Sequence, residues 1–285
     1  MQIFSDAAEA RDAVIKARGQ GRKVGLVPTM GALHDGHLSL VKLAQQYCDE
    51  TVATIFVNPT QFAPTDDLDK YPRTLEQDCE ALAAAGVTGV FVPTVETMYP
   101  DGFSTFVDPP EVARSLEGVC RPGHFRGVTT VVMKLMNILP TTHAFFGRKD
   151  YQQLKVIETM VRDLDVGVTV IAGETIREPD GLALSSRNRY LNHTDRTRAL
   201  LLSKALNETK KMIAEGERSA EGLQDAMRHV LLGDNDIAGV DKIDYAVVVN
   251  GDTLSQVDQI ADNAVALIAA FVGETRLIDN ITLIP

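Results

Sequence analysis

The sequence predicts an α/β protein in which a doubly wound parallel sheet is followed by a smaller α+β domain. Short apolar, β-branched runs alternate with helix-like segments through the first part of the chain. This alternation stops after Gly173, where two long helical stretches precede three strand-like runs. With 285 residues the chain is long enough for two modest cores. We therefore expect one domain at residues 1–175 and a second at residues 176–285.

The elements of the first domain follow one another as strand and helix. Val24–Val27 and Thr51–Val57 are apolar and β-branched, as is typical of strands buried on both faces. Asp35 suits the N-cap of the helix that follows the first strand. The expected strands are Val24–Val27, Thr51–Val57, Gly89–Val92, His143–Phe146 and Val166–Ile171, and the expected helices are Gly36–Tyr47, Thr74–Ala85, Gly127–Leu139 and Asp150–Asp163.

The second domain has a different order of elements. Two amphipathic stretches are expected to form helices, and three apolar runs after them are expected to form a small antiparallel sheet. The helices are expected at Leu191–Glu215 and Ala220–Leu232, and the strands at Ile243–Val249, Ala264–Val272 and Arg276–Ile281.

Composition excludes several classes of partner. The net charge is −11, from 28 basic and 39 acidic residues, so the surface repels nucleic acid and anionic membranes. The N-terminus lacks the pattern of a signal peptide, and the longest apolar run, Ala264–Val272, is too short to span a bilayer. Three scattered cysteines without a CxxC motif fit reduced thiols. We expect a cytoplasmic protein without nucleic-acid or membrane partners.

Two histidines three residues apart mark the first strand-to-helix turn. His34 and His37 flank Gly36, after a tight Pro-Thr-Met-Gly turn at 28–31. Helix N–H groups exposed at Gly36 and His37 would attract a nucleotide phosphate, and Gly36 would let a flat base or ribose approach closely. The alternatives are surface histidines or half of a metal site, although no Cys or Glu at ligand spacing completes a zinc site.

Polar residues also follow the second strand. Asn58 and Gln61 form either an Asn-Pro turn with solvated side chains or a site where the Gln61 amide donates to a substrate oxygen. The acidic residues Asp66, Asp67 and Asp69 either attract Mg²⁺ or a cationic amine, or belong to a solvated loop.

Three later segments carry charge or hydroxyl groups. Arg121, His124 and Arg126 form either an anion lid or a solvated loop. At the next strand-to-helix turn, Lys149 offers a point charge to phosphate, Asp150 is a candidate helix cap, and Gln153 is expected to point towards the site. The segment Ser185-Ser186-Arg187 is either a phosphate clamp or a hydrophilic linker.

Together these segments resemble the pantoate–β-alanine ligase family. The matching stretches are PTMGALHDGHLSL (28–40), FVNPTQF (56–62), RPGHFRGV (121–128), GRKDYQQL (147–154) and DGLALSSRN (180–188). The resemblance implies the Rossmann-like HIGH-type nucleotidyltransferase fold, with the signature His34-Asp35-Gly36-His37. The lysine-rich mobile loop of that superfamily corresponds to residues 184–187, which lack both lysines, so Lys149 and Arg187 would supply the positive charge.

The resemblance also implies a reaction. ATP and (R)-pantoate would form pantoyl adenylate and pyrophosphate, and β-alanine would then give pantothenate and AMP. The first domain would bind ATP and pantoate, the second would close over the site, Mg²⁺ would be held through the phosphates, and the chain would be a homodimer. The expected catalytic residues are His34, His37, Lys149, Ser185, Ser186 and Arg187. The expected ATP-binding residues are Pro28, Met30, Gly31, Ala32, Leu33, His34, Asp35, Gly36, His37, Gly147, Arg148, Lys149, Asp150, Ile176, Leu184, Ser185, Ser186 and Arg187. The expected pantoate and β-alanine site contains Met30, Asn58, Gln61 and Gln153, and no metal ligands are expected in the protein.

Two other functions fit parts of the pattern. A nucleotidyltransferase of the same superfamily would attach AMP to a phosphorylated acceptor and release no AMP. An ATP-binding sensor would need no pocket for a second substrate. Gln61 and Gln153 indicate such a pocket and therefore argue against a sensor. Formation of AMP distinguishes these alternatives from the ligase.

Overall fold

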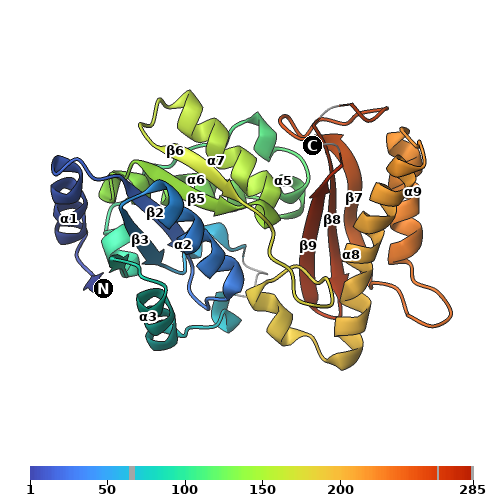
Figure 1. Ribbon diagram of the computed structural model, residues 1–285, viewed down its shortest axis with the longest axis horizontal. Helices are drawn as coiled ribbons and strands as arrows, with labels where there is room; N and C mark the ends of the chain where they lie inside the picture. Colours follow the sequence, from blue (N-terminus) through green and yellow to red (C-terminus); the bar gives the residue numbers. More distant parts are fainter. Residues whose placement is uncertain (64–67, 262, 284–285) are drawn as a thin grey trace. The chain divides into compact units, whose positions relative to one another are not determined.

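The computed structural model describes residues 1–63, 68–261 and 263–283 (Figure 1). The chain divides into two compact units, each built on its own sheet. Unit 1 contains Met1–Arg148 and Gln152–Glu174, and unit 2 contains Lys149–Tyr151 and Thr175–Pro285. The three residues Lys149–Tyr151 thus belong to unit 2 although the chain on both sides of them belongs to unit 1.

Unit 1 contains a six-stranded parallel sheet with the order β1-β4-β3-β2-β5-β6. The strands are β1 (Gln2–Phe4), β2 (Val24–Thr29), β3 (Glu50–Ile55), β4 (Gly89–Phe91), β5 (His143–Gly147) and β6 (Thr169–Gly173). From β2 the chain adds β3 and β4 on one side, and later β5 and β6 on the other. The order therefore reverses between β2 and β5, where open α/β sheets bind ligands beyond the carboxyl ends of their strands. The predicted doubly wound parallel sheet is confirmed.

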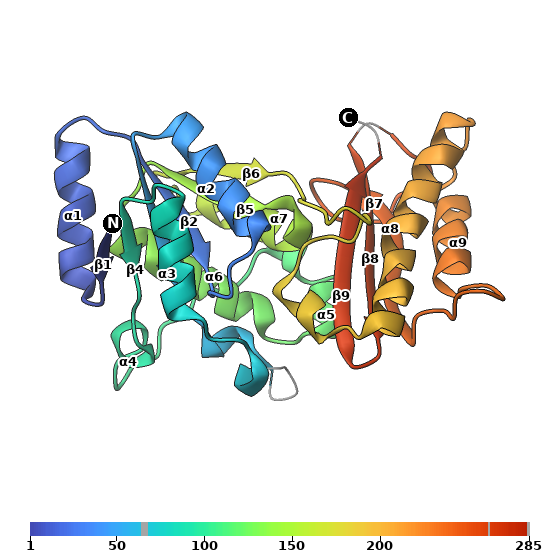
Figure 2. The same cartoon turned by 60° about the horizontal axis from the view of Figure 1, so that its bottom comes forward.

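Helices cover both faces of this sheet. On one face lie α2 (Asp35–Tyr47) and α3 (Leu75–Ala84) (Figure 2). These two helices bury Val41 and Leu82 against Val27, Val90 and Phe145 of the sheet. On the opposite face α1 (Ala7–Gly19) and α6 (His124–Ile138) pack against each other. The remaining helices of this part of the chain are α4 (Val95–Met98), α5 (Glu117–Cys120), α7 (Tyr151–Asp163) and the 3₁₀ helices η1 (Pro59–Gln61), η2 (Leu68–Lys70), η3 (Glu111–Ala113) and η4 (Arg148–Asp150).

The sequence analysis did not assign the first strand and helix, nor the short helices α4 and α5. Strand β1 is an edge strand that pairs with β4, and α1 follows it with Asp6 as its N-cap. Three strand residues are too few to show a period, but Ala10, Val14 and Ala17 of α1 are buried at helical spacing. Other predicted elements differ at their ends: β3 ends at Ile55, β6 begins at Thr169, and α6 begins at His124.

Unit 2 contains an antiparallel sheet of three strands and two long helices, as the sequence predicted. The strands are β7 (Lys242–Asn250), β8 (Ala264–Val272) and β9 (Thr275–Thr282), and the helices are α8 (His193–Ala214) and α9 (Ala220–Leu231). Both helices pack on one face of the sheet, where Leu206 and Met227 contact the core that includes Ile268 of β8.

An ion-pair cluster ties the outer strands of this small sheet together. Asp244 of β7 accepts from Lys242 and from Arg276 of β9, each at 2.7 Å. The Asp244 side chain is only 6% exposed. Burial alone would raise the pKa of Asp244, but the hydrogen bonds from its two cationic partners outweigh burial and hold that pKa below its ordinary value.

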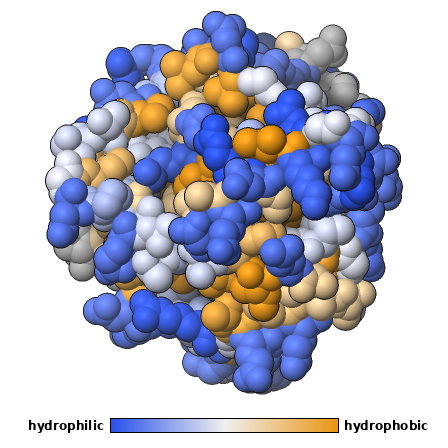
Figure 3. Space-filling view, turned by 90° about the vertical axis from the view of Figure 1, so that its left-hand side faces the viewer, coloured by the Kyte–Doolittle hydropathy of each residue, from blue (hydrophilic) through white to orange (hydrophobic). Residues whose placement is uncertain are grey.

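The surface of unit 1 is mixed in polarity. Figure 3 views the end of the unit that carries α1, where hydrophobic residues form separate patches between hydrophilic ones. Ile3 and Ile15 are examples of large hydrophobic side chains that are exposed, at 58% and 48%. None of the helices in the described part of the chain has the length and apolar character needed to cross a bilayer.

Candidate active site

The two histidines that follow β2 cap helix α2 reciprocally. His34 is the N-cap, with an extended backbone, and its Nδ1 accepts the backbone N–H of Gly36 at 3.1 Å. The Nδ1 of His37, in turn, accepts the backbone N–H of His34 at 3.3 Å. The prediction that Asp35 is the N-cap is wrong, because Asp35 is already the first helical residue. The expectation of exposed N–H groups is also wrong, since the N–H of His37 donates to the carbonyl of His34.

This capping fixes the protonation pattern of both rings. A neutral imidazole has one donor nitrogen and one acceptor nitrogen, so a ring whose Nδ1 accepts carries its proton on Nε2. The ring centroids of His34 and His37 are 4.1 Å apart, with the planes tilted by 38°. In their neutral forms both rings therefore carry a donor at Nε2, and both lie at the positive end of the α2 dipole.

The turn between β2 and α2 has a left-handed backbone. Gly31 has φ +81° and Ala32 has φ +51°. The carboxylate of Asp78, on α3, accepts the N–H of Ala32 at 2.9 Å and that of Leu33 at 2.8 Å. These two N–H groups are thus used within the protein, and any contact of the turn with a nucleotide involves other atoms. Sequence reasoning missed Asp78, because it lies on an amphipathic helix among other acidic residues.

Gln61 lies beyond the carboxyl end of β3 and is only 9% exposed. Its Oε1 accepts from Asn58 Nδ2 at 3.1 Å, and its Nε2 donates to the sulfur of Met30 at 3.2 Å. The backbone carbonyl of Gln61 lies 2.8 Å from Nδ1 of the buried His124, on α6. Both the side chain and the backbone of Gln61 are therefore held in place.

Asn58 organises this region. It is 1% exposed, its Nδ2 also donates to the Gly127 carbonyl at 3.2 Å, and its Oδ1 accepts from the Tyr99 hydroxyl at 2.8 Å. Burial raises the pKa of Tyr99, which keeps its phenol protonated as a donor. The alternative of solvated side chains in an Asn-Pro turn is wrong, because Asn58 and Gln61 are both buried.

Helix α6 approaches η1 closely because position 127 is glycine. A Cβ atom on Gly127 would lie 2.3 Å from the carbonyl oxygen of Thr60 and 2.6 Å from the amide nitrogen of Gln61. Both are backbone atoms that cannot rotate away. Gly127 thus permits the packing that positions Gln61.

The basic loop at the start of α6 does not form a lid of three free cations. His124 is buried against Gln61, and one Arg121 nitrogen lies 3.2 Å from His124 Nε2. Arg126 donates to Asp108 at 3.1 Å and lies over the ring of Phe106. His124 therefore belongs neither to a solvated loop nor to a lid, whereas a role of Arg121 and Arg126 towards an anion stays a prediction.

The turn after β5 brings charged residues to the carboxyl edge of the same sheet. Gly147 ends the strand, and Arg148 forms an ion pair with Glu174 at 3.1 Å. Asp150 lies in η4, directly before α7, and its carboxylate is 3.8 Å from the Lys149 ammonium. In α7, Gln153 is partly exposed.

The neighbouring glutamine has a structural role. Gln152 is 4% exposed, accepts the N–H of Glu117 at 2.9 Å, and donates to the carbonyls of Val112 and Ser115. It therefore anchors the loop between η3 and α5.

In unit 2, the segment that carries Ser185, Ser186 and Arg187 follows a short hairpin. Ile176 and Leu184 pair across this hairpin, since the Leu184 N–H donates to the Ile176 carbonyl at 2.9 Å. Ser185 then caps η5 (Ser186–Tyr190), with its Oγ accepting the N–H of Arg187 at 3.3 Å.

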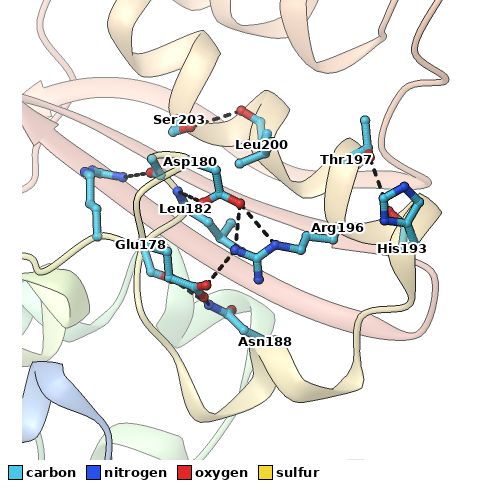
Figure 4. Close-up of polar contacts among 12 residues, drawn as sticks. Glu178, Asp180, Leu182, Asn188, His193, Arg196, Thr197, Leu200 and Ser203 are labelled. Atoms are coloured by element: carbon cyan, nitrogen blue, oxygen red, sulfur yellow. Dashed lines mark hydrogen bonds and ion pairs between the residues drawn. The ribbon is translucent and has the colours of Figure 1, made fainter.

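A polar network fixes the hairpin and the segment after it (Figure 4). Arg196 of α8 donates to Glu178 and to Asp180, each at 2.6 Å, and Asn188 Nδ2 donates to the other oxygen of Glu178 at 2.8 Å. Burial raises the pKa of Asp180, but the hydrogen bonds from Arg196 and from the Leu182 N–H, together with the charge of Arg196, lower that pKa overall. Arg177 adds a bidentate pair with the buried Asp279 of β9. This network fixes the segments on both sides of Ser185, Ser186 and Arg187, and the two interpretations of these three residues stay predictions.

The structure brings together one part of the predicted site within unit 1. Met30, His34, His37, Asn58 and Gln61 lie at the carboxyl ends of β2 and β3, beside the reversal of strand order. Lys149, Ser185, Ser186 and Arg187 belong to unit 2.

No group of three or more His, Cys, Asp or Glu side chains that could hold a metal occurs within residues 1–63, 68–261 and 263–283. Asp66 and Asp67 lie outside these described residues, whereas Asp69 lies in η2.

Comparisons with known proteins agree with this geometry. A family model described as Pantoate-beta-alanine ligase matches residues 2–282. The chain is 53% identical over 272 residues to the pantothenate synthetase of Rhodopirellula baltica, with 94% of each chain covered. It is 48% identical over 283 residues to that of Moorella thermoacetica, with 99% of each chain covered.

Solved structures give the same result. The pantothenate synthetase of Thermus thermophilus matches with a TM-score of 0.93 at 41% identity, covering 100% of both chains. The pantoate-beta-alanine ligase of Francisella tularensis, complexed with beta-gamma ATP and beta-alanine, matches with a TM-score of 0.77 at 35% identity, covering 99% and 98%. The expected family is confirmed: the chain belongs to the pantoate-beta-alanine ligase family.

Proposed function

We propose that the chain condenses (R)-pantoate with β-alanine at the expense of ATP, forming pantothenate, AMP and pyrophosphate through pantoyl adenylate. Family membership supports this reaction. The Francisella ligase, complexed with beta-gamma ATP and beta-alanine, supports the nature of two substrates. The observation that carries the proposal is the reciprocal capping of His34 and His37, because it fixes two imidazole donors at the start of α2.

In the first step a pantoate carboxylate oxygen attacks the α-phosphorus of ATP. The new O–P bond forms as the bond to the bridging oxygen breaks, and pyrophosphate leaves. Because the carboxylate is already ionised at pH 7, the attack needs no general base. Catalysis then depends on alignment and on stabilising the charge on the phosphate oxygens.

The protein supplies donors for that charge. We assign the Nε2–H groups of His34 and His37 to the phosphate oxygens, together with the Lys149 ammonium and the Arg187 guanidinium. Ser185 and Ser186 add hydroxyl donors. The other residues proposed to contact ATP are Pro28, Met30, Gly31, Ala32, Leu33, Asp35, Gly36, Gly147, Arg148, Asp150, Ile176 and Leu184.

The pantoate site is proposed at Met30, Gln61 and Gln153. A neutral amide can orient a carboxylate and hydroxyl groups without the strong neutralisation that an arginine would bring, and this keeps the carboxylate nucleophilic. Asn58 acts through Gln61 in this proposal, because both N–H groups of Asn58 already donate within the chain, whereas Gln61 Nε2 has a second N–H for pantoate.

In the second step the amine of β-alanine attacks the acyl carbonyl of the adenylate. A C–N bond forms, the C–O bond to AMP breaks, and the ammonium of β-alanine gives up a proton. AMP leaves readily because its phosphate is a stable anion.

Mg²⁺ is proposed to bind through the phosphates of ATP, where it would neutralise part of their charge. Unit 1 is proposed to bind ATP and pantoate, with unit 2 closing over them. A homodimeric, cytoplasmic enzyme also stays a prediction.

One assay tests the proposed function. AMP formation from ATP is expected to require pantoate and β-alanine together, and pantoate alone is expected to release about one pyrophosphate per site. Continuous pyrophosphate release without β-alanine, or a dinucleotide product without AMP, would contradict the proposal and favour another transferase.

A further inference from the structure

Asp78 is a buried carboxylate that the proposed mechanism does not use. Its side chain lies on α3, and the residue is 3% exposed. Its Oδ2 accepts from Ala32 N–H at 2.9 Å and from Thr74 Oγ1 at 3.1 Å, while its Oδ1 accepts from Leu33 N–H at 2.8 Å. A buried carboxylate is stable only when such donors compensate for its lost hydration.

Thr74 contributes in an unusual way. It occupies the N-cap position of α3, yet its hydroxyl makes no capping hydrogen bond to that helix. The hydroxyl donates to Asp78 instead. The start of α3 is therefore arranged around the carboxylate rather than around its own helix end.

The turn that Asp78 holds is conformationally costly. Ala32 has φ +51°, in the left-handed region, where the Cβ atom crowds the following carbonyl oxygen. Such a residue persists only when its surroundings determine its conformation. The preceding residue, Gly31, lies so close that a Cβ there would be 3.0 Å from Asp78 Oδ2. In this left-handed turn the N–H groups of Ala32 and Leu33 both point to the carboxylate.

The same turn leads directly into the histidine pair. His34 follows Leu33, and its N–H and ring then complete the caps with His37 and Gly36. A change in the path of residues 31–33 would move the ring of His34 and the donor that it presents.

We propose that Asp78 is a positioning residue that clamps the backbone of Ala32 and Leu33 and thereby sets the placement of the His34–His37 pair for ATP. This inference rests on the proposed function, since it takes that pair to face the phosphates. Asp78 itself touches no reacting atom. An asparagine there would keep one acceptor oxygen but would turn an NH₂ group towards a backbone N–H.

The test compares Asp78→Asn with Ala32→Gly, singly and combined, in the AMP assay of the full chain. Asp78→Asn is expected to lower kcat/KM for ATP by about tenfold or more, with KM for β-alanine within twofold of the wild type. Ala32→Gly in that background is expected to recover activity by at least threefold, because glycine adopts φ > 0 without the steric cost. Glu76→Gln, which removes an exposed charge from the same helix, is the matched control and is expected to be silent.

If Asp78→Asn folds poorly, Thr74→Val is measured in its place. It removes only the hydroxyl donor and is expected to change ATP kinetics in the same direction by a smaller factor. Wild-type ATP kinetics in Asp78→Asn, or in Thr74→Val if Asp78→Asn does not fold, would overturn the inference. So would equal losses for all substrates with no recovery by Ala32→Gly. Absence of AMP formation by the wild type would instead refute the proposed function.

Discussion

Gly127→Ala is expected to slow adenylate formation by displacing Gln61. The new Cβ would lie 2.3 Å from the Thr60 carbonyl oxygen, whereas ordinary contact begins at 3.4 Å. The backbone of η1, or of α6, must therefore move by about 1 Å to relieve the contact. A misplacement of about 1 Å at a reacting group can cost roughly 10²-fold in rate, which corresponds to about 2.7 kcal/mol in the barrier.

The assay is single-turnover formation of pantoyl adenylate at saturating ATP, with pantoate varied. Because Gln61 is proposed to hold pantoate, the loss should appear in kcat/KM for pantoate, while the KM for ATP should change little. Overpacking also destabilises folded proteins by about 1–3 kcal/mol, so thermal unfolding is followed in parallel.

Gly19→Ala is the matched control, because nothing lies within 4 Å of its added Cβ. It also places alanine in a helix, at the end of α1. If Gly127→Ala kept its kcat/KM for pantoate within threefold of the wild type, the argument that α6 positions Gln61 through this close contact would be refuted.

Other changes test the proposed donors, the pantoate site and a structural carboxylate. His37→Ala and Lys149→Ala are each expected to lower turnover by about 10² or more, and near wild-type turnover would remove that residue from its role. The melting temperature should fall by a few degrees at most in His37→Ala, which loses one cap of α2, and should change little in Lys149→Ala. Gln153→Arg is expected to slow adenylate formation in a single-turnover assay even if pantoate binds, and an unchanged rate would count against a neutral amide as the orienting group. Because its folded-state pKa is lowered, the ionised Asp244 contributes stability above its unfolded pKa that is lost as pH falls through the folded pKa. In chemical denaturation, the free energy of unfolding of Asp244→Asn should therefore fall less than that of the wild type between pH 5 and about 2. If the two free energies fell in parallel with pH, Asp244 would not be the cause of the acid destabilisation.

Much of the fold was predictable because burial dictates local composition. The strand around Val52–Ile55 is buried on both faces and therefore reads as a continuous apolar run. The short β1 could not be recognised from three residues, because its stability comes from pairing with β4, which is distant in sequence. Helix α1 carried a usable signal in Asp6 and in the spacing of its buried residues.

The site was predictable as a set of motifs but not as a set of contacts. Aspartate is a better N-cap than histidine on general preference, so the sequence favoured Asp35 over His34. The caps instead come from two imidazole rings: the His34 ring accepts the N–H of Gly36, and the His37 ring accepts the N–H of His34. The roles of Asp78 and His124 could not be predicted from the sequence either, because both residues bind backbone groups of distant segments.

Because Lys149–Tyr151 belongs to unit 2 but lies between two segments of unit 1, no single cleavage of the chain separates the two units. Tyr151 donates to the carbonyl of Gly251 at 3.0 Å, and Asn280 donates to the carbonyl of Lys149 at 2.8 Å. A fragment beginning at Thr175 would lack both of these partners, although it would contain every strand of the small sheet. Exchanging unit 2 between relatives at one crossover point would therefore separate it from these three residues. A chimera would have to take Lys149–Tyr151 and unit 2 from the same parent protein.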